Sequence, residues 1–342
     1  MTIHNIITAN SKHMPLDNCS VNLIVTSPPY PMISLWDNLF EQLCPEIVAD
    51  RVANDGKAVY SKMHGVLDAV WRECDRVLKP GGIICINIGD ATRTINKHFA
   101  VYSNHSRIIE FFESMCYTTL PLIIWQKVSN SPTKFMGSGM LPTGAYVTQE
   151  HEYILIFRKG DSRQYNTVIE KNLRHESGYF YEERNVWFSD VWRIKGERQK
   201  NVIKDLRSCK ASYPLEIPYR LINMFSIKGD VVLDPFNGTG TTMLASMLSE
   251  RNSVGIEIEP KFAEYVKQRS LLEKDVLNER VYKRYKQHMT ASRTKNYGIV
   301  SDVHNFKVKT VQEKGIRLSE IQDINWRMNT ALVKYNKIGE VG

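Results

Sequence analysis

The hydrophobic positions of this chain predict strands that alternate with helices. Short apolar runs rich in β-branched residues and bounded by Gly, Pro or Asn indicate buried strands, and apolar positions three and four residues apart indicate amphipathic helices. The strands expected are Ile3 to Ala9, Val21 to Thr26, Ile83 to Ile88, Leu120 to Lys127, His151 to Arg158, Val231 to Leu233 and Ser253 to Ile258. The helices expected lie within Pro31 to Lys62, at His64 to Leu78, Asn104 to Met115 and Pro214 to Phe225, from near Thr241, and from Lys261 to about Lys286.

This alternation predicts an α/β fold with a mostly parallel sheet and helices on both faces. The strands Leu120 to Lys127 and His151 to Arg158 have no helix between them, so we expect antiparallel neighbours at the sheet edge. The Gly, Ser and Pro-rich loop that joins them, Ser129 to Gly144, is long enough to be functional. The segment Pro31 to Lys62 is expected either to fold over the preceding loop or to form a packed surface helix.

Between Gly160 and Cys209 the periodicity is weak, and aromatic residues are interleaved with basic ones. Such a mixture is typical of a surface that meets phosphates and bases. It is equally typical of an irregular subdomain built around a small aromatic core. Both interpretations stay open at this point.

The length of 342 residues allows one large α/β core together with a smaller domain or extensions. Nothing resembles a signal peptide, and no apolar run approaches the roughly 18 residues of a membrane span, so a cytoplasmic protein is expected. The six cysteines include no close pair, which indicates neither a disulfide framework nor a zinc site. We therefore expect no metal.

The net charge of +8 favours a polyanionic partner, and its distribution is uneven. From Pro260 to Gly342 there are 17 Lys and Arg against 9 Asp and Glu, an excess equal to that of the whole chain. Arg280 to Lys309 alone contains eight basic residues and one acid. This region is expected either to be a solvated basic tail or to contact nucleic acid.

A first candidate site follows the strand Val21 to Thr26, where the sequence is Ser27-Pro28-Pro29-Tyr30. The two prolines lack N–H groups and stiffen the backbone at the end of the strand. Ligands of α/β sheets bind at the carboxyl ends of the strands, and there a fixed carbonyl beside a hydroxyl and a phenol offers hydrogen-bond acceptors and an aromatic wall. Such a cradle suits a planar ring with an amino group. The alternative is a turn with a packing tyrosine.

A second candidate site is Asp234-Pro-Phe-Asn-Gly-Thr-Gly-Thr-Thr242, between a strand and a helix. Gly238 and Gly240 allow the backbone to approach a ligand closely. The segment lacks the Gly-Lys-Ser/Thr of a phosphate loop, which favours a ligand without phosphates. Glu257 ends the next strand, where an acid binds ribose hydroxyls, and Asp234 is suited to a cationic ammonium. An adenosine with an amino-acid tail fits these parts.

Both segments resemble motifs of the amino-methylating DNA methyltransferases, which use S-adenosylmethionine on cytosine N4 or adenine N6. Ser27-Pro-Pro-Tyr30 resembles their catalytic motif, and Asp234 to Thr242 resembles their cofactor loop. Lys210 to Pro214 stands where their proline-containing helix is entered. The catalytic motif precedes the cofactor loop, which is the circularly permuted order of the β class. The resemblance covers about Ile3 to Arg269.

This resemblance implies a Rossmann-like methyltransferase fold that binds S-adenosylmethionine and double-stranded DNA. The implied catalytic residues are Ser27, Pro28, Pro29 and Tyr30. The implied cofactor-binding residues are Asn10, Ser212, Asp234, Phe236, Asn237, Gly238, Gly240, Thr241 and Glu257. The family often has Asp at the position of Asn10, so the contact of this residue with the adenine amino group is a departure from the pattern.

Serine in the first motif position resembles the N4-cytosine members, whereas Asp or Asn is more typical of N6-adenine enzymes. An adenine-N6 activity is the alternative. Methyltransferases of protein glutamine or of RNA also use Pro-Pro-Tyr loops, but they usually place the cofactor loop first. A binding module without catalysis is a third interpretation, against which the intact motifs speak. The chain has no Pro-Cys dipeptide, which argues against carbon-5 methylation.

The expected organisation has four parts. Residues 1–160 form the catalytic half of the methyltransferase domain, 161–209 a target-recognition region, 210–270 the cofactor-binding half, and 271–342 a basic C-terminal extension. Membership of a restriction-modification system is expected, with a cognate endonuclease that acts separately. A monomer and a dimer both remain open.

Overall fold

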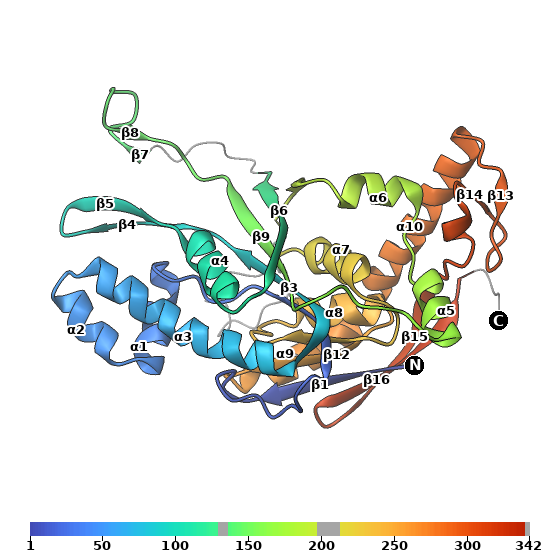
Figure 1. Cartoon of the computed structure of the whole chain (residues 1–342), viewed down its shortest axis with the longest axis horizontal. Coiled ribbons are helices and arrows are strands. Elements are labelled where there is room, and N and C mark those ends of the chain that lie inside the picture. Colours follow the sequence, from blue (N-terminus) through green and yellow to red (C-terminus); the bar gives the residue numbers. More distant parts are fainter. Residues whose placement is uncertain (129–135, 197–212, 339–342) are drawn as a thin grey trace.

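A single mixed sheet runs through the protein, which we describe from a computed structural model at residues 1–128, 136–196 and 213–338. Within these ranges ten strands form the sheet in the order β10-β6-β9-β3-β2-β11-β12-β1-β16-β15 (Figure 1). Their bounds are β1 (Thr2–Thr8), β2 (Val21–Thr26), β3 (Leu78–Ile88), β6 (Thr118–Lys127), β9 (His151–Arg158), β10 (Val191–Ile194), β11 (Val231–Asp234), β12 (Asn252–Glu257), β15 (Ser319–Arg327) and β16 (Thr330–Lys337).

The five central strands β3, β2, β11, β12 and β1 are mutually parallel. Antiparallel pairing joins β9 to β3 and to β6 on one side, and β16 to β1 and to β15 on the other. The predicted α/β fold, mostly parallel with antiparallel strands, is confirmed. The antiparallel pairing of β6 with β9 is confirmed as well, but β6 is not the edge, because β10 pairs with it in parallel.

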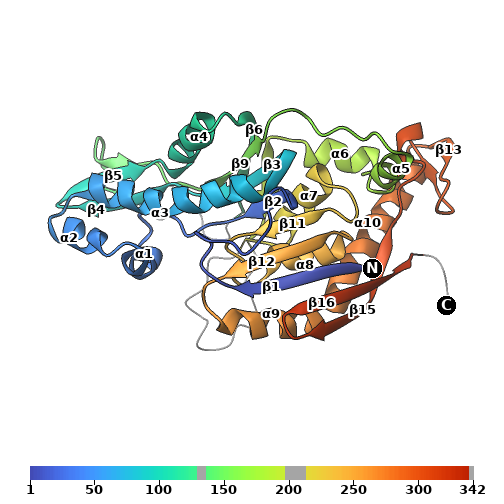
Figure 2. The same ribbon diagram turned by 60° about the horizontal axis from the view of Figure 1, so that its bottom comes forward.

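Helices cover both faces of the sheet, as Figure 2 shows. Because successive side chains of a strand point to opposite faces, β2 contributes to two cores. Leu23 and Val25 pack in the cluster that contains residues of the helices Glu216–Phe225 and Thr241–Leu248. Ile24 packs in the cluster that contains residues of the helices Gly56–Val77 and Asn104–Ser114. The helices are α1 (Asp37–Leu43), α2 (Glu46–Val52), α3 (Gly56–Val77), α4 (Asn104–Ser114), α5 (Val168–Glu176), α6 (Tyr181–Trp187), α7 (Glu216–Phe225), α8 (Thr241–Leu248), α9 (Lys261–Leu272) and α10 (Lys274–Thr294).

Several predicted boundaries differ from the structure. The helix expected from Lys261 to Lys286 is two helices, α9 and α10, which separate at Glu273 so that both contact β15. The residues Lys79 to Gly82 end a helix as expected, but they already belong to β3. A hairpin, β4 (Ala91–Ile95) and β5 (His98–Tyr102), was not predicted at all.

The C-terminal region is part of the sheet. Strands β15 and β16 form a hairpin, and β16 pairs with β1 from Thr2↔Val333 to Asn5↔Thr330. A solvated tail is therefore wrong as a description of these residues. The remaining short elements are η1 (Ser34–Trp36), β7 (Met136–Gly137), β8 (Ala145–Tyr146), β13 (Ile299–Val300), β14 (Lys307–Val308) and η3 (Val311–Glu313).

Aromatic residues of the 160–196 segment form a packed cluster with α10. Phe180 is fully buried and stacks on His288 at 3.7 Å between ring centroids. Trp187 and Trp192 are also buried, and the Trp192 indole donates to the Trp187 carbonyl at 3.0 Å. Tyr181 and Phe188 remain exposed. The aromatic-core interpretation therefore describes the buried part of this segment, and residues 197–209 lie outside the described ranges.

Candidate active site

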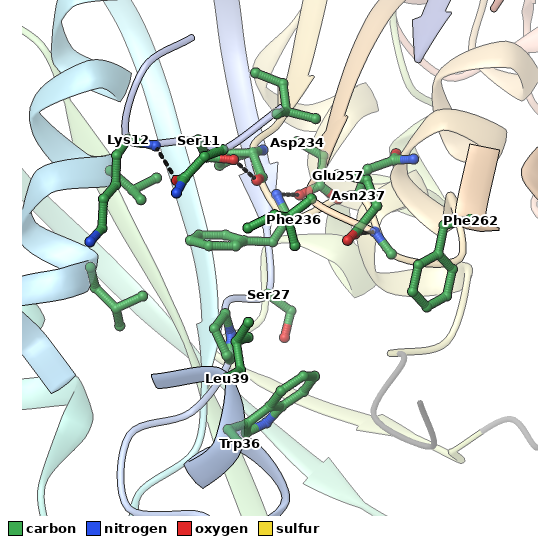
Figure 3. A pocket seen from close by; sticks show the side chains of 18 of the residues that line it. Ser11, Lys12, Ser27, Trp36, Leu39, Asp234, Phe236, Asn237, Glu257 and Phe262 are labelled. Carbon is green, nitrogen blue, oxygen red and sulfur yellow. Dashed lines mark hydrogen bonds between the residues drawn. The ribbon is translucent and has the colours of Figure 1, made fainter. Parts of the chain in front are cut away.

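The two sequence motifs meet at one end of the sheet. Strand β2 delivers Ser27 and strand β11 delivers Asp234, and the two strands are parallel neighbours, with Leu23 opposite Val232. One cavity is lined by residues that follow both strands. Figure 3 shows Ser27, Trp36 and Leu39 on one side of this cavity and Asn237, Glu257 and Phe262 on another. The two motifs, which are about two hundred residues apart in sequence, are therefore neighbours in the structure.

Asp234 is buried and held by three hydrogen bonds. The hydroxyls of Thr26 and Thr242 each donate to its carboxylate at 2.6 Å, and the Phe236 amide donates at 3.0 Å. Tyr213 extends the network, since its hydroxyl lies 2.5 Å from that of Thr242. Burial raises the pKa of Asp234 to about 6, because removal from water penalises the charged form more than the hydrogen bonds favour it. A cationic ligand group in the cavity would restore the charged state.

Glu257 lines the side of the cavity that is formed at the ends of β11 and β12. Its carboxylate accepts from the Gly238 amide at 2.8 Å and from the Glu259 amide at 3.0 Å. Burial raises its pKa. The carboxylate lines the cavity from the end of β12. This position agrees with the expectation from the sequence.

Asn237 contributes a buried amide to the cavity lining. It is 4% exposed, and its side chain lies so close to Gly255 that a Cβ there would be 2.3 Å from it. Neither the oxygen nor the nitrogen of this amide has a hydrogen-bond partner in the described part of the chain. Buried polar groups are normally paired, so these two atoms indicate a ligand that supplies both a donor and an acceptor.

The two glycines of the second motif differ in their surroundings. Gly238 lines the cavity and has φ +45°, and a Cβ there would make an ordinary 3.9 Å contact with the Phe236 carbonyl oxygen. Gly240, at the start of α8, has φ +78°, and a Cβ there would be 2.7 Å from Val266 of α9. Its lack of a side chain therefore serves helix packing, and it does not line the cavity. Phe236 and Thr241 do line it.

Asn10 reaches the cavity from the end of β1. Its side-chain oxygen accepts from the Lys12 amide at 3.0 Å, and Ser11 and Lys12 also contribute to the lining. Ser212, which the sequence places among the cofactor-binding residues, lies outside the described ranges. The segment after Tyr30 does fold over the site, because Trp36, Leu39 and Leu43 contribute side chains to the cavity.

Behind Ser27 lies a polar network that the sequence analysis missed. The Tyr30 hydroxyl donates to Glu152 at 2.7 Å and lies 3.2 Å from the Ser27 hydroxyl. The Asn87 amide donates to Tyr30 at 2.8 Å and to Glu152 at 2.6 Å, and Lys127 forms an ion pair with Glu152. Burial, together with the nearby Glu152 charge, raises the pKa of Tyr30 well above its usual value.

This network is buried and extends away from the cavity. Asn87 and Glu152 are 2% and 8% exposed, and neither lines the cavity, whereas Ser27 does. The ring of Tyr30 lies over Gly89, where a Cβ would be only 3.1 Å from it. Pro28 and Pro29 are buried, and Pro29 lines the cavity. The signal in the sequence was an acidic residue, Glu152, at the second position of a strand whose centre is apolar, where it is buried.

Some of the basic residues between Arg280 and Lys309 form ion pairs inside the protein, and others are exposed to solvent. Arg280 pairs with Glu216, and Arg284 pairs with Glu183 at 2.5 Å while stacking near Phe180. The exposed ones are Lys283, Lys286, Arg293, Lys295, Lys307 and Lys309. The end of α10 beside β13 and β14 lies at the opposite end of the molecule from α1 and α3 in Figures 1 and 2.

Two features are absent from the described ranges. Among the helices of these ranges, none combines the length and the hydrophobicity that a membrane span requires. Within the same ranges, no group of three or more His, Cys, Asp or Glu side chains is arranged to hold a metal ion.

Known proteins resemble this chain in sequence over most of its length. It is 52% identical over 320 residues to the type II methyltransferase M.MthZI of Methanothermobacter thermautotrophicus, covering 93% of this chain and 90% of that protein. It is 50% identical over 270 residues to the type II methyltransferase M.MjaI of Methanocaldococcus jannaschii, covering 75% and 88% of the two chains.

Solved structures show the same fold. A putative DNA modification methylase of Thermus thermophilus, complexed with S-adenosyl-L-methionine, is 30% identical, with a TM-score of 0.62 over 79% of this chain and 94% of that one. The cytosine-N4-specific PvuII DNA methyltransferase, at 17% identity and a TM-score of 0.55 over 81% and 93% of the two chains, shares the fold.

The sheet order, the cavity at the ends of β2 and β11, and these likenesses define the class of α/β methyltransferases that modify DNA. Residues 21–268 match the N6_N4_Mtase family, described as DNA methylase, and the chain belongs to this family.

Proposed function

We propose that this DNA methylase transfers a methyl group from S-adenosylmethionine to the N4 amino group of cytosine in duplex DNA. The observation that carries the proposal is the position of Ser27. Its hydroxyl lines the same cavity as Asp234, Asn237 and Glu257 of the cofactor side. A serine at this motif position resembles the N4-cytosine members of the family, and adenine N6 is the alternative target.

The residues present fit S-adenosylmethionine. The unpaired amide of Asn237 is available to the ligand, and Asp234 is suited to its ammonium group. Glu257 is suited to the ribose hydroxyls, and Asn10 to the adenine. Phe236 and Phe262 supply apolar surface around the ring. When bound, S-adenosylmethionine would supply a methyl group attached to a sulfonium sulfur, and this sulfur would be the leaving group as the amino nitrogen bonds to the methyl carbon.

The other side of the cavity is proposed to hold the base. An exocyclic amino group is a poor nucleophile because its lone pair is delocalised into the ring. Ser27 and the Pro28 carbonyl accept hydrogen bonds from its hydrogens, which favours a more tetrahedral nitrogen. Tyr30 stacks on the base, which must leave the duplex at a cost of a few kcal/mol of unstacking. Positioning of the two reactants contributes most of the catalysis.

Recognition of the DNA sequence is assigned to residues 161–209. The described part of this segment exposes Arg174, Tyr181, Arg184 and Phe188, which are suited to phosphates and bases. We further infer a restriction-modification system, since the relatives named above are type II methyltransferases. A cognate endonuclease would then act separately on the same sequence. DNA affinity is expected to fall steeply with salt.

The test is labelled methyl transfer to duplex DNA, RNA and protein in parallel, followed by mass spectrometry of the nucleosides. The expected product is N4-methylcytosine in DNA. N6-methyladenine as the only product would reject cytosine as the target. A label found only in RNA or protein would reject DNA as the substrate.

A further inference from the structure

The network behind Ser27 has a defined hydrogen-bond direction. The carboxylate of Glu152 only accepts, so the single hydroxyl hydrogen of Tyr30 is directed to it. The amide nitrogen of Asn87 also only donates, and it points at the same phenol oxygen. Ser27 must therefore donate its own hydrogen to Tyr30. Among the described residues, the Ser27 oxygen accepts only a 3.5 Å contact from the Asn87 amide, so one lone pair remains available to the cavity.

We propose that Glu152 is a positioning residue of the methyl transfer. It sets the orientation of the Ser27 hydroxyl, and it receives, through Tyr30 and Ser27, the proton that the methylated amino group must lose. This inference rests on the function proposed above. It adds a residue that lies outside both sequence motifs and does not line the cavity.

The proton needs an acceptor because the motif of this chain has none of its own. When the amino nitrogen forms its bond to the methyl carbon, the carbon–sulfur bond breaks with its electrons on sulfur, and the nitrogen becomes positively charged. One N–H proton then passes to the Ser27 oxygen, the Ser27 proton to Tyr30, and the Tyr30 proton to Glu152. The methylated amine, Ser27 and Tyr30 end neutral, and Glu152 ends protonated.

The geometry favours Glu152 over Asp234 as the acceptor of this proton. Asp234 accepts from Thr26, Thr242 and Phe236, and it is suited to the cofactor ammonium. Glu152 is connected to Ser27 by two hydrogen bonds of 3.2 and 2.7 Å. Glu152 also accepts from Asn87 and forms an ion pair with Lys127, whose side chain is 44% exposed, so this end of the network reaches the surface.

The experiment compares Glu152→Gln and Tyr30→Phe with the wild-type chain. Glutamine keeps an acceptor for the Tyr30 hydrogen but cannot take up the proton, and phenylalanine keeps the ring but interrupts the relay. Glu320→Gln is the matched control, because Glu320 accepts a 2.6 Å hydrogen bond from Tyr282 on the surface. Single-turnover methyl transfer to DNA is measured from acidic to alkaline pH, and cofactor affinity is measured by calorimetry.

For both variants we expect unchanged cofactor affinity and a rate reduced on the order of 10²-fold, typical of a lost general base. The pH dependence of the wild-type rate should be lost in Glu152→Gln, because glutamine cannot take up the transferred proton. The control should behave as the wild type. A wild-type rate and pH profile in Glu152→Gln would overturn the inference.

Failure of this inference is distinguishable from failure of the proposed function. If the wild-type chain methylates no cytosine, the proposed function is wrong. If it does and Glu152→Gln is equally active, only the role of Glu152 is wrong. Should Glu152→Gln fail to fold, as judged by circular dichroism, Tyr30→Phe decides, because a wild-type pH profile in that variant excludes the relay.

Discussion

Thr26 donates a 2.6 Å hydrogen bond to Asp234, and this contact joins the ends of two strands that are 208 residues apart in sequence. Thr26 immediately precedes the Ser27 loop, and Asp234 begins the second motif, which is proposed to bind the cofactor. The same carboxylate accepts from Thr242 at the start of α8. One buried acid thus couples the two loops of the site.

Replacing Thr26 with Val should destabilise the protein. The substitution keeps the shape of the side chain but removes one of three donors to a buried carboxylate, at a cost of about 1 to 3 kcal/mol. Chemical denaturation measures the loss, and calorimetry should show weaker cofactor binding. Thr8→Val, at an exposed position of β1, is the control and should change neither. Equal stability of the Thr26 and Thr8 variants would contradict the coupling.

Cofactor affinity should depend on pH through Asp234. Burial raises the folded-state pKa of this carboxyl to about 6, so the free protein holds a proton below that pH. If the charged carboxylate binds the cofactor ammonium, binding releases the proton. Affinity should then rise as the pH increases through about 6 and level off above it. Calorimetry in two buffers of different ionisation enthalpy would detect the released proton. A flat profile would remove Asp234 from the ammonium contact.

Asp234 should also make the stability of the cofactor-free protein depend on pH. Stability should fall as the pH rises, whereas cofactor affinity should increase. Its folded pKa lies above the unfolded value of 3.8, so the folded state binds more protons between about 4 and 6. This contribution to stability is complete below pH 4 and is lost as the pH rises through about 6. In Asp234→Asn that loss should be absent from a series of melting curves. If the melting temperature of the variant depended on pH as that of the wild type does, groups other than Asp234 would determine the pH dependence of stability.

Gly240→Ala should be more damaging than Gly229→Ala. Both glycines have positive φ, +78° and +82°, so both substitutions carry a similar backbone strain. Only the Cβ at residue 240 collides with Val266, whereas that at residue 229 meets open space. The expected difference is about 1 to 3 kcal/mol in the free energy of unfolding. Equal losses would mean that α9 shifts freely away from α8.

Ser27→Ala should abolish most methyl transfer and leave cofactor binding intact. The hydroxyl faces the cavity and the Tyr30 network, and no contact joins it to Asp234 or Glu257 among the described residues. Single-turnover kinetics and calorimetry on the same preparation separate the two effects. A Ser27→Ala variant that turns over at the wild-type rate would remove the role proposed for this side chain.

Local signals accounted for most of the sheet. The strands predicted at Val21–Thr26 and His151–Arg158 agree with the structure to the residue, because each apolar run is followed within a few residues by a proline or a glycine. The β4–β5 hairpin was missed because its turn uses Asn96 and Lys97, both with positive φ, and not a glycine. The turn signal in the sequence was therefore weak.

Contacts between distant segments accounted for what the sequence could not predict. Glu152 was overlooked because its partner Tyr30 is 122 residues away, and nothing local indicates that the strand end carrying it faces the catalytic loop. The integration of the C-terminal hairpin was missed for the same reason, since β16 pairs with the N-terminal strand. The sequence predicts that Gly240 lets the backbone approach a ligand, whereas in the structure its missing side chain makes room for Val266.

The most direct measurement is sequencing, with detection of modified bases, of the chromosome of a host that expresses the wild-type chain or Ser27→Ala. The account predicts N4-methylcytosine at one recurring sequence in the first host and unmodified DNA in the second. Modified adenine alone, or the same modification in both hosts, would contradict it.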